Sequence, residues 1–161
     1  PIIAALSGAC TGGGAGIAAA CDIRIATADL RFGFPIARTL GNTLSIENLA
    51  RLSALIGPAR TTEIVFTARL VGAQEALAAG LVTEVLPDHA ALMARAYELA
   101  AQIAGHAPLT LRAIKEGLRR LRVDGPHADD ADLIVMTFMS EDFREGLDAF
   151  FNKRKPEFKA R

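Results

Sequence analysis

Short apolar runs and glycine-rich turns alternate over the first half of the chain. Residues 1–6 are apolar without interruption, which is typical of a fully buried strand with neighbours on both sides in a parallel sheet. Residues 22–27 alternate and predict a second strand, residues 30–35 a short extended segment, and residues 81–85 a further strand. Because a domain rarely begins inside its own core, we expect an N-terminal piece to be missing.

Helical segments are predicted between these strands. Alanines after the glycines at 12–14 favour a helix over residues 15–21. Ser45 is a suitable N-cap for a helix that ends near residue 56, before Gly57-Pro58. The remaining predictions for this half are a loop at 36–44 and helices at 59–66 and 73–79, the last closed by Gly80.

From residue 88 onward the pattern is helical. Apolar residues recur at helical spacing through residues 88–104. The other predicted helices are one that begins at Pro108 and two over residues 129–139 and 141–154. The pattern therefore predicts an α/β part, residues 1–87, followed by a helical region, residues 88–161.

Composition excludes several functions. The chain has 161 residues, with 18 basic and 18 acidic side chains, so its net charge is zero, which argues against a nucleic-acid partner. Cys10 and Cys21 are too few for a disulfide framework, and a reduced, cytoplasmic setting is the default. No apolar run reaches the roughly 18 residues of a membrane helix, so no membrane partner is predicted.

The strand, glycine turn and helix over residues 2–20 give the strongest local signal for a binding site. Glycines allow close backbone approach, and the N–H groups at a helix start attract an oxyanion or a phosphate. Two other interpretations remain open: a dinucleotide fingerprint, Gly14-x-Gly16-x-x-Ala19, and a turn that only permits close packing. The dinucleotide pattern lacks its acidic residue, because Asp22 lies at the start of the second strand rather than after it.

Several motifs, in order and spacing, resemble those of the enoyl-CoA hydratase/isomerase (crotonase) family. They lie at residues 1–8, 12–14, 21–26, 32–35, 51–60, 67–82 and 140–158. The resemblance implies an α/β fold with a crotonase-like ββα spiral core, its N-terminal turns missing here, followed by C-terminal helices. It also implies a homotrimer or hexamer.

The resemblance assigns site residues by position. The backbone N–H of Gly13 matches one oxyanion donor of the family. The positions that match the substrate pocket are Gly12, Gly14, Gly16, Pro35 and Ile36. A hydratase of this family has its two catalytic glutamates at the positions of Gly16 and Ile36. Because glycine and isoleucine cannot move a proton, the hydratase acid/base pair is absent.

Glu47 is the one carboxylate between Asp29 and Glu63, near the expected pocket. It is a candidate for proton chemistry, although a carboxylate just after Ser45 also complements the helix dipole. Thr39, Thr43 and Asn48 can bind substrate or serve as loop and cap residues.

Phe150 and Lys153 match family positions that contact the CoA nucleotide, where an aromatic ring stacks on adenine and a lysine pairs with phosphate. An amphipathic terminal helix that docks its apolar face explains the same residues.

Together these residues predict a crotonase-family acyl-CoA thioester enzyme that stabilises an enolate or oxyanion, with chemistry diverged from hydration. The alternatives are a non-catalytic CoA-thioester-binding or scaffold subunit and a dinucleotide-binding module. Acyl-CoA is the expected partner, and no cofactor is predicted because coenzyme A belongs to the substrate. No metal site is predicted, since the three histidines show no ligand spacing.

Overall fold

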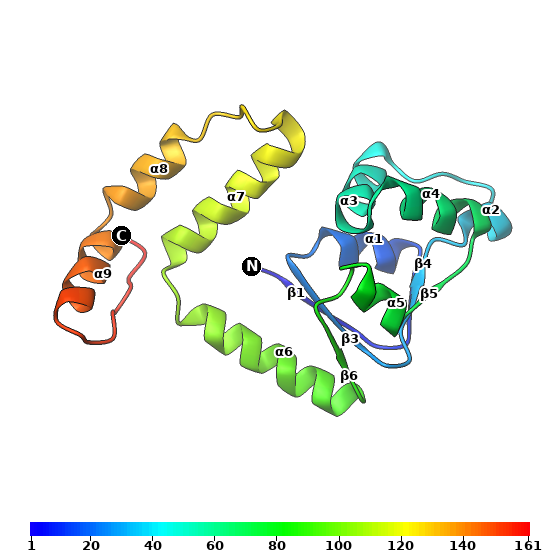
Figure 1. Ribbon diagram of the computed structural model, residues 1–161, viewed down its shortest axis with the longest axis horizontal. Coiled ribbons are helices and arrows are strands. Elements are labelled where there is room, and N and C mark those ends of the chain that lie inside the picture. Colours follow the sequence, from blue (N-terminus) through cyan, green and yellow to red (C-terminus); the bar gives the residue numbers. More distant parts are fainter. The chain divides into compact units, whose positions relative to one another are not determined.

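The computed structural model describes all 161 residues, and their contacts form two compact units. The larger unit comprises residues 2–98, and the smaller comprises residues 99–161 together with Pro1. The division falls inside helix α6 (His89–Ala104), whereas the sequence pattern places the change from strands to helices at residues 87–88. Each unit is described by itself (Figure 1).

Two small sheets form the framework of the larger unit. The first has the order β1-β3-β6 with all strands parallel, and it consists of β1 (Ile3–Leu6), β3 (Ile23–Thr27) and β6 (Glu84–Leu86). The second has the order β2-β4-β5, and it consists of β2 (Ala9–Thr11), β4 (Arg31–Gly33) and β5 (Val71–Gly72). In it β2 pairs parallel with β4, and β5 pairs antiparallel with β4.

The chain visits the two sheets in turn. It passes from β1 into β2 and then into helix α1 (Gly13–Ala20), and afterwards from β3 into β4 and then into α2 (Ile36–Thr39). Each circuit thus adds one strand to each sheet and ends in a helix, which is the expected ββα spiral. The unit is completed by α3 (Ile46–Ile56), α4 (Pro58–Thr67) and α5 (Ala73–Ala78), with α3 in contact with both α1 and α4.

Burial explains why these elements hold together. The fully buried side chains of Phe32 and Phe34 meet edge to face, with ring centroids 5.8 Å apart. Leu52 of α3 and Ile64 of α4 close the same core cluster. The predicted cap of α3 is confirmed, because the Ser45 hydroxyl accepts the N–H of Asn48 at 3.2 Å.

A buried arginine ties three segments of this unit together. The Arg24 guanidinium, on β3, donates to the carbonyl oxygens of Leu81 at 2.7 Å, Cys21 at 2.5 Å and Ala18 at 3.4 Å. Burial lowers the pKa of Arg24, yet an arginine keeps its charge in proteins. These bonds fix the end of α1 and the segment after α5 beside the central strand.

The prediction of a loop over residues 36–44 is wrong for its first part. Residues 36–39 form α2, because the carbonyl of Pro35 accepts the N–H groups of Arg38 and Thr39, each at 3.1 Å. One turn of helix is too short to leave a periodic pattern in the sequence. A helix of this length is also too short to be recognised from propensity.

Two predictions for strands also need correction. The expected strand at 81–85 begins later, at Glu84, because the N–H groups of Leu81 and Val82 both bond to the carbonyl of Ala76 in the turn that ends α5. Gly80, with φ of 76°, sits at the C′ position of that turn as predicted. The three-residue strand β2 was not predicted.

The first strand differs from its predicted burial. Within this structure β1 lies at the edge of its sheet, paired only with β3. Leu6 is buried, residues 3–5 are half-buried, and Ile2 is 55% exposed. The continuous apolar run of residues 1–6 is therefore not fully buried here.

The smaller unit contains the last part of α6 and three further helices. These are α7 (Pro108–Asp124), α8 (Ala131–Phe138) and α9 (Glu141–Phe151), in which α8 contacts both α7 and α9. Ser140 caps α9 by accepting the N–H of Phe143 at 3.0 Å. None of the helices combines the length and apolar character that crossing a bilayer requires.

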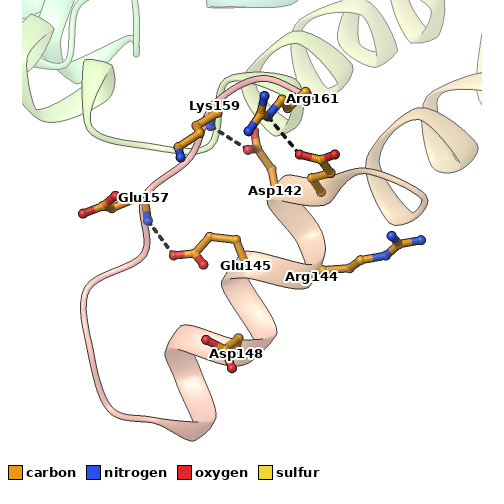
Figure 2. A pocket seen from close by; sticks show the side chains of 8 residues that line it. Asp142, Arg144, Glu145, Asp148, Glu157, Lys159 and Arg161 are labelled. Carbon is orange, nitrogen blue, oxygen red and sulfur yellow. Dashed lines mark hydrogen bonds and ion pairs between the residues drawn. The ribbon is translucent and has the colours of Figure 1, made fainter.

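The C-terminal residues return along α9 and are held there by two carboxylates (Figure 2). Asp142 accepts the backbone N–H groups of Lys159 at 2.6 Å and Ala160 at 2.9 Å. Glu145 accepts the N–H of Glu157 at 2.8 Å and forms a two-pronged pair with the Arg154 guanidinium, at 2.6 and 2.8 Å. The acidic side chains in this hollow are thus engaged with the tail.

The pKa of Glu145 offers a test of this tail arrangement. The Arg154 guanidinium, followed by the N–H of Glu157, lowers the pKa of Glu145 to about 2 from 4.5. Because the folded-state pKa is the lower one, this stabilisation is present above about pH 4.5 and is lost as the pH falls through 2. In an NMR titration of Glu145, Arg154→Gln should move the midpoint upward, toward the ordinary value.

Arg144→Gln is the matched control, because Arg144 lies on the same helix and points away from Glu145 in Figure 2. An unchanged midpoint in Arg154→Gln would contradict the assigned cause.

Candidate functional site

The N-terminus of α1 is shaped by the glycine turn before it. Gly12 adopts φ of 56° and ψ of −121°, a conformation that a side chain disfavours. Its N–H donates to the carbonyl of Gly33 at 3.1 Å, which fastens the turn to β4. Gly13 and Gly14 follow as exposed residues of the first helical turn, whose N–H groups have no partner within a helix. The positive end of α1 is thus available to a ligand.

A cavity of about 450 Å³ opens beside this turn. It lies wholly within the larger unit. Its lining residues come from the turn, α1, α2, the segment after α2, and α3: Gly12, Gly13, Gly16, Ile17, Ala20, Ile36, Leu40, Asn42, Thr43, Leu44, Asn48 and Arg51. The structure therefore brings together six residues that the sequence named as site or substrate-binding candidates: Gly12, Gly13, Gly16, Ile36, Thr43 and Asn48.

Four other candidate residues do not line this cavity: Gly14, Pro35, Thr39 and Glu47. The side chain of Glu47 is 70% exposed and pairs with Arg51, one helical turn later, at 2.5 Å. Glu47 lies in the first turn of α3, where a carboxylate complements the helix dipole. The structure thus agrees with the interpretation of Glu47 as a carboxylate that complements the helix dipole, and Glu47 does not line the cavity.

Several lining residues were not singled out from the sequence. Ile17 and Ala20 follow Gly13 at helical spacing, so the same face of α1 was a usable signal for them. Leu40 and Leu44 belong to the segment predicted as loop, where no periodicity marks them. Arg51 was noted only as part of a family motif.

The chemical character of the cavity follows from these residues. No Asp, Glu or His is among them, and Arg51 is the one charged side chain. The carboxamides of Asn42 and Asn48 and the hydroxyl of Thr43 are the neutral polar groups. The arrangement can stabilise negative charge at the N–H of Gly13, but its side chains offer no proton acceptor suited to neutral pH.

The geometry places Cys10 outside this cavity. It is half-buried on β2, before the turn, and is not among the lining residues. Burial raises the pKa of the Cys10 thiol, so the reactive thiolate is disfavoured at neutral pH.

The two residues predicted to contact CoA lie in the smaller unit. Phe150, on α9, is 77% exposed, and its ring meets that of Phe151 edge to face at a centroid distance of 5.8 Å. Lys153 follows the helix in the left-handed region, with φ of 51°, and is exposed. Their role in binding CoA stays a prediction.

The dinucleotide interpretation does not fit the local structure. Gly14 and Gly16 lie inside α1, whereas the fingerprint needs its first glycine in the turn before the helix. The turn here belongs to Gly12 alone.

Comparisons with known proteins show the family of this chain. Residues 1–161 match the family model described as enoyl-CoA hydratase/isomerase. The chain is 38% identical to the short-chain-enoyl-CoA hydratase of Clostridium acetobutylicum, over 98% of this chain and 60% of that protein. It is 35% identical to the 2,3-dehydroadipyl-CoA hydratase of Escherichia coli, over 100% of this chain and 64% of that protein.

The solved structures give the same result. An enoyl-CoA hydratase/isomerase family protein from Hyphomonas neptunium superposes with a TM-score of 0.90 at 36% identity, over 100% of this chain and 62% of that one. The chain thus spans about three fifths of the length of these relatives. The predicted crotonase-type α/β fold is confirmed.

The turn before α1 yields a test by paired substitutions. Gly12→Ala should lower the free energy of unfolding by about 1–3 kcal/mol, because it forces a side chain into an unfavourable backbone conformation. In Gly14→Ala, two residues later, the added Cβ meets no atom within 4 Å. This substitution should raise the free energy of unfolding by up to about 1 kcal/mol through helix propensity. Urea unfolding measures both, and equal effects of the two substitutions would argue against the turn described.

Proposed function

Because this chain belongs to the enoyl-CoA hydratase/isomerase family, we propose that it forms part of an acyl-CoA thioester enzyme whose chemistry differs from hydration. One observation carries the proposal: the cavity beside α1 includes Gly13 at the helix start but no carboxylate or histidine. The first feature suits a thioester that gains negative charge, and the second removes the usual means of activating water.

The N–H of Gly13 supplies the stabilising group. A thioester carbonyl oxygen gains negative charge when its α-proton leaves or when a nucleophile adds to the carbonyl carbon. An N–H that is fixed at a helix start stabilises that charge without reorganising, and the helix dipole adds to it. Gly12 fixes its direction through the bond to the carbonyl of Gly33.

Proton transfer is where this site departs from a hydratase. Gly16 and Ile36 hold the positions that resemble the two hydratase glutamates, and both line the cavity. Arginine stays protonated and carboxamides do not titrate, so Arg51, Asn42 and Asn48 cannot replace them as bases. We therefore expect isomerisation or hydrolysis, with a proton acceptor from outside this cavity.

A second candidate is a non-catalytic subunit that binds CoA thioesters, which the lack of a carboxylate in the cavity favours. Both candidates use the same ligand, with Phe150 and Lys153 at the nucleotide. The homotrimer or hexamer and the cytoplasmic setting belong to the proposal on the same family grounds.

A panel of acyl-CoA thioesters tests the function on the full-length protein. Turnover is followed by chromatography of crotonyl-CoA, a 3-enoyl-CoA and a saturated acyl-CoA, and binding by calorimetry. Conversion of the 3-enoyl or saturated thioester with little hydration of crotonyl-CoA supports the divergent enzyme. Binding without any conversion supports the non-catalytic subunit, and hydration at ordinary enzymatic rates would refute both.

Gly13→Pro tests the oxyanion donor directly. Proline removes the N–H and is well accommodated at the first helical position, which Gly13 occupies, so α1 should remain intact. We expect kcat for the thioester that is turned over fastest to fall about 100-fold or more relative to Gly13→Ala, which retains the N–H. Equal kcat values in the two variants would show that this N–H is not the donor.

A further inference from the structure

The side chain of Asn48 faces Gly16 across the cavity. A Cβ placed on Gly16 would lie 3.6 Å from Nδ2, 3.7 Å from Oδ1 and 3.9 Å from Cγ of Asn48. The carboxamide thus lies beside the helix face at the position where a hydratase carries a glutamate. The neutral carboxamide of Asn48 thus lies next to the position that carries an acidic side chain in a hydratase.

This carboxamide has no hydrogen-bond partner within the chain, although the backbone of Asn48 does. The backbone N–H of Asn48 donates to the Ser45 hydroxyl at 3.2 Å, which fixes the residue in the first turn of α3. The cavity around it is largely apolar, with Ile17, Ile36 and Leu44 among its walls. A half-buried amide in such surroundings gains from a partner that a ligand brings.

The spacing along α1 indicates which part of a bound acyl-CoA would lie beside the Asn48 carboxamide. Gly13 and Gly16 are three residues apart, so their separation along the helix axis is about 4.5 Å. If the thioester carbonyl accepts the N–H of Gly13, the acyl chain passes Gly16 a few bonds further on. When the acyl chain runs along α1 from that carbonyl, its third carbon comes toward Gly16 and Asn48.

We propose that Asn48 binds an oxygen substituent on the acyl chain of the substrate, at or near its third carbon, and so selects oxygenated acyl groups over plain ones. This inference rests on the proposed function. A carboxamide both donates and accepts, so it can satisfy a hydroxyl completely. Asn48 is therefore a substrate-binding residue that does not itself move a proton.

The test compares two ligands that differ by one hydroxyl. Isothermal titration of the full-length protein gives the Kd of 3-hydroxybutyryl-CoA and of butyryl-CoA, and their ratio is the readout. In Asn48→Leu, which keeps the approximate shape and removes the hydrogen bonds, we expect the ratio to shift by about fivefold against the hydroxylated ligand. A purely structural defect would weaken both ligands alike and leave the ratio unchanged.

Asn42→Leu is the matched control, because Asn42 lines the same cavity but is not among the atoms facing Gly16. It should keep the wild-type ratio. Asn48→Ala, which removes the whole carboxamide, replaces the leucine variant if that variant fails to fold, and it should shift the ratio in the same direction.

Two results would overturn the proposal while leaving the proposed function standing: an unchanged ratio in the Asn48 variants, or a shift that appears in Asn42→Leu instead. Failure of both ligands to bind the wild-type protein would be a different result. It would refute the proposed function itself, and the role of Asn48 with it.

Discussion

The hydrogen bond from the N–H of Gly12 to the carbonyl of Gly33 fixes the start of α1, and the cavity depends on it. Gly33 lies so near the backbone of the segment before β5 that a Cβ there would be 2.9 Å from the carbonyl oxygen of Arg69. That position therefore excludes a side chain. The carbonyl of Gly33 in turn holds the N–H of Gly12, whose positive φ turns the chain into the helix. Packing between strands thus determines where the N–H of Gly13 lies.

Small residues along α1 also allow α3 to pack against it, beside the cavity. Ala15 and Ala18 are buried, and α1 contacts α3. Because Gly16 adds no side chain, α3 can bring Asn48 close to the helix face. A helix of alanine and glycine is weak in intrinsic stability at its glycines, but it permits an approach that larger residues would prevent. The shape of this cavity therefore depends on the packing of α3 against α1.

The sequence predicted the fold well because its motifs mark backbone constraints. The turn glycines, the Ser45 cap and the Gly80 terminus each follow from local chemistry, and each was found. Glu47 shows what local chemistry cannot predict, which is the direction in which a helical side chain points relative to the cavity. Neighbouring helix positions such as 47 and 48 point in directions about 100° apart, and only the packing of α3 on α1 decides that Asn48 faces the cavity while Glu47 pairs with Arg51.

Gly16 and Ile36, at the two positions predicted to match hydratase glutamates, both pack against their neighbours. A glutamate at position 16 would compete with the Asn48 carboxamide, since even a Cβ there is in van der Waals contact with it. A glutamate at position 36 would replace a side chain that is 7% exposed within the core cluster, where burying a carboxylate costs free energy. The residues at positions 16 and 36 are thus part of the packing of this chain.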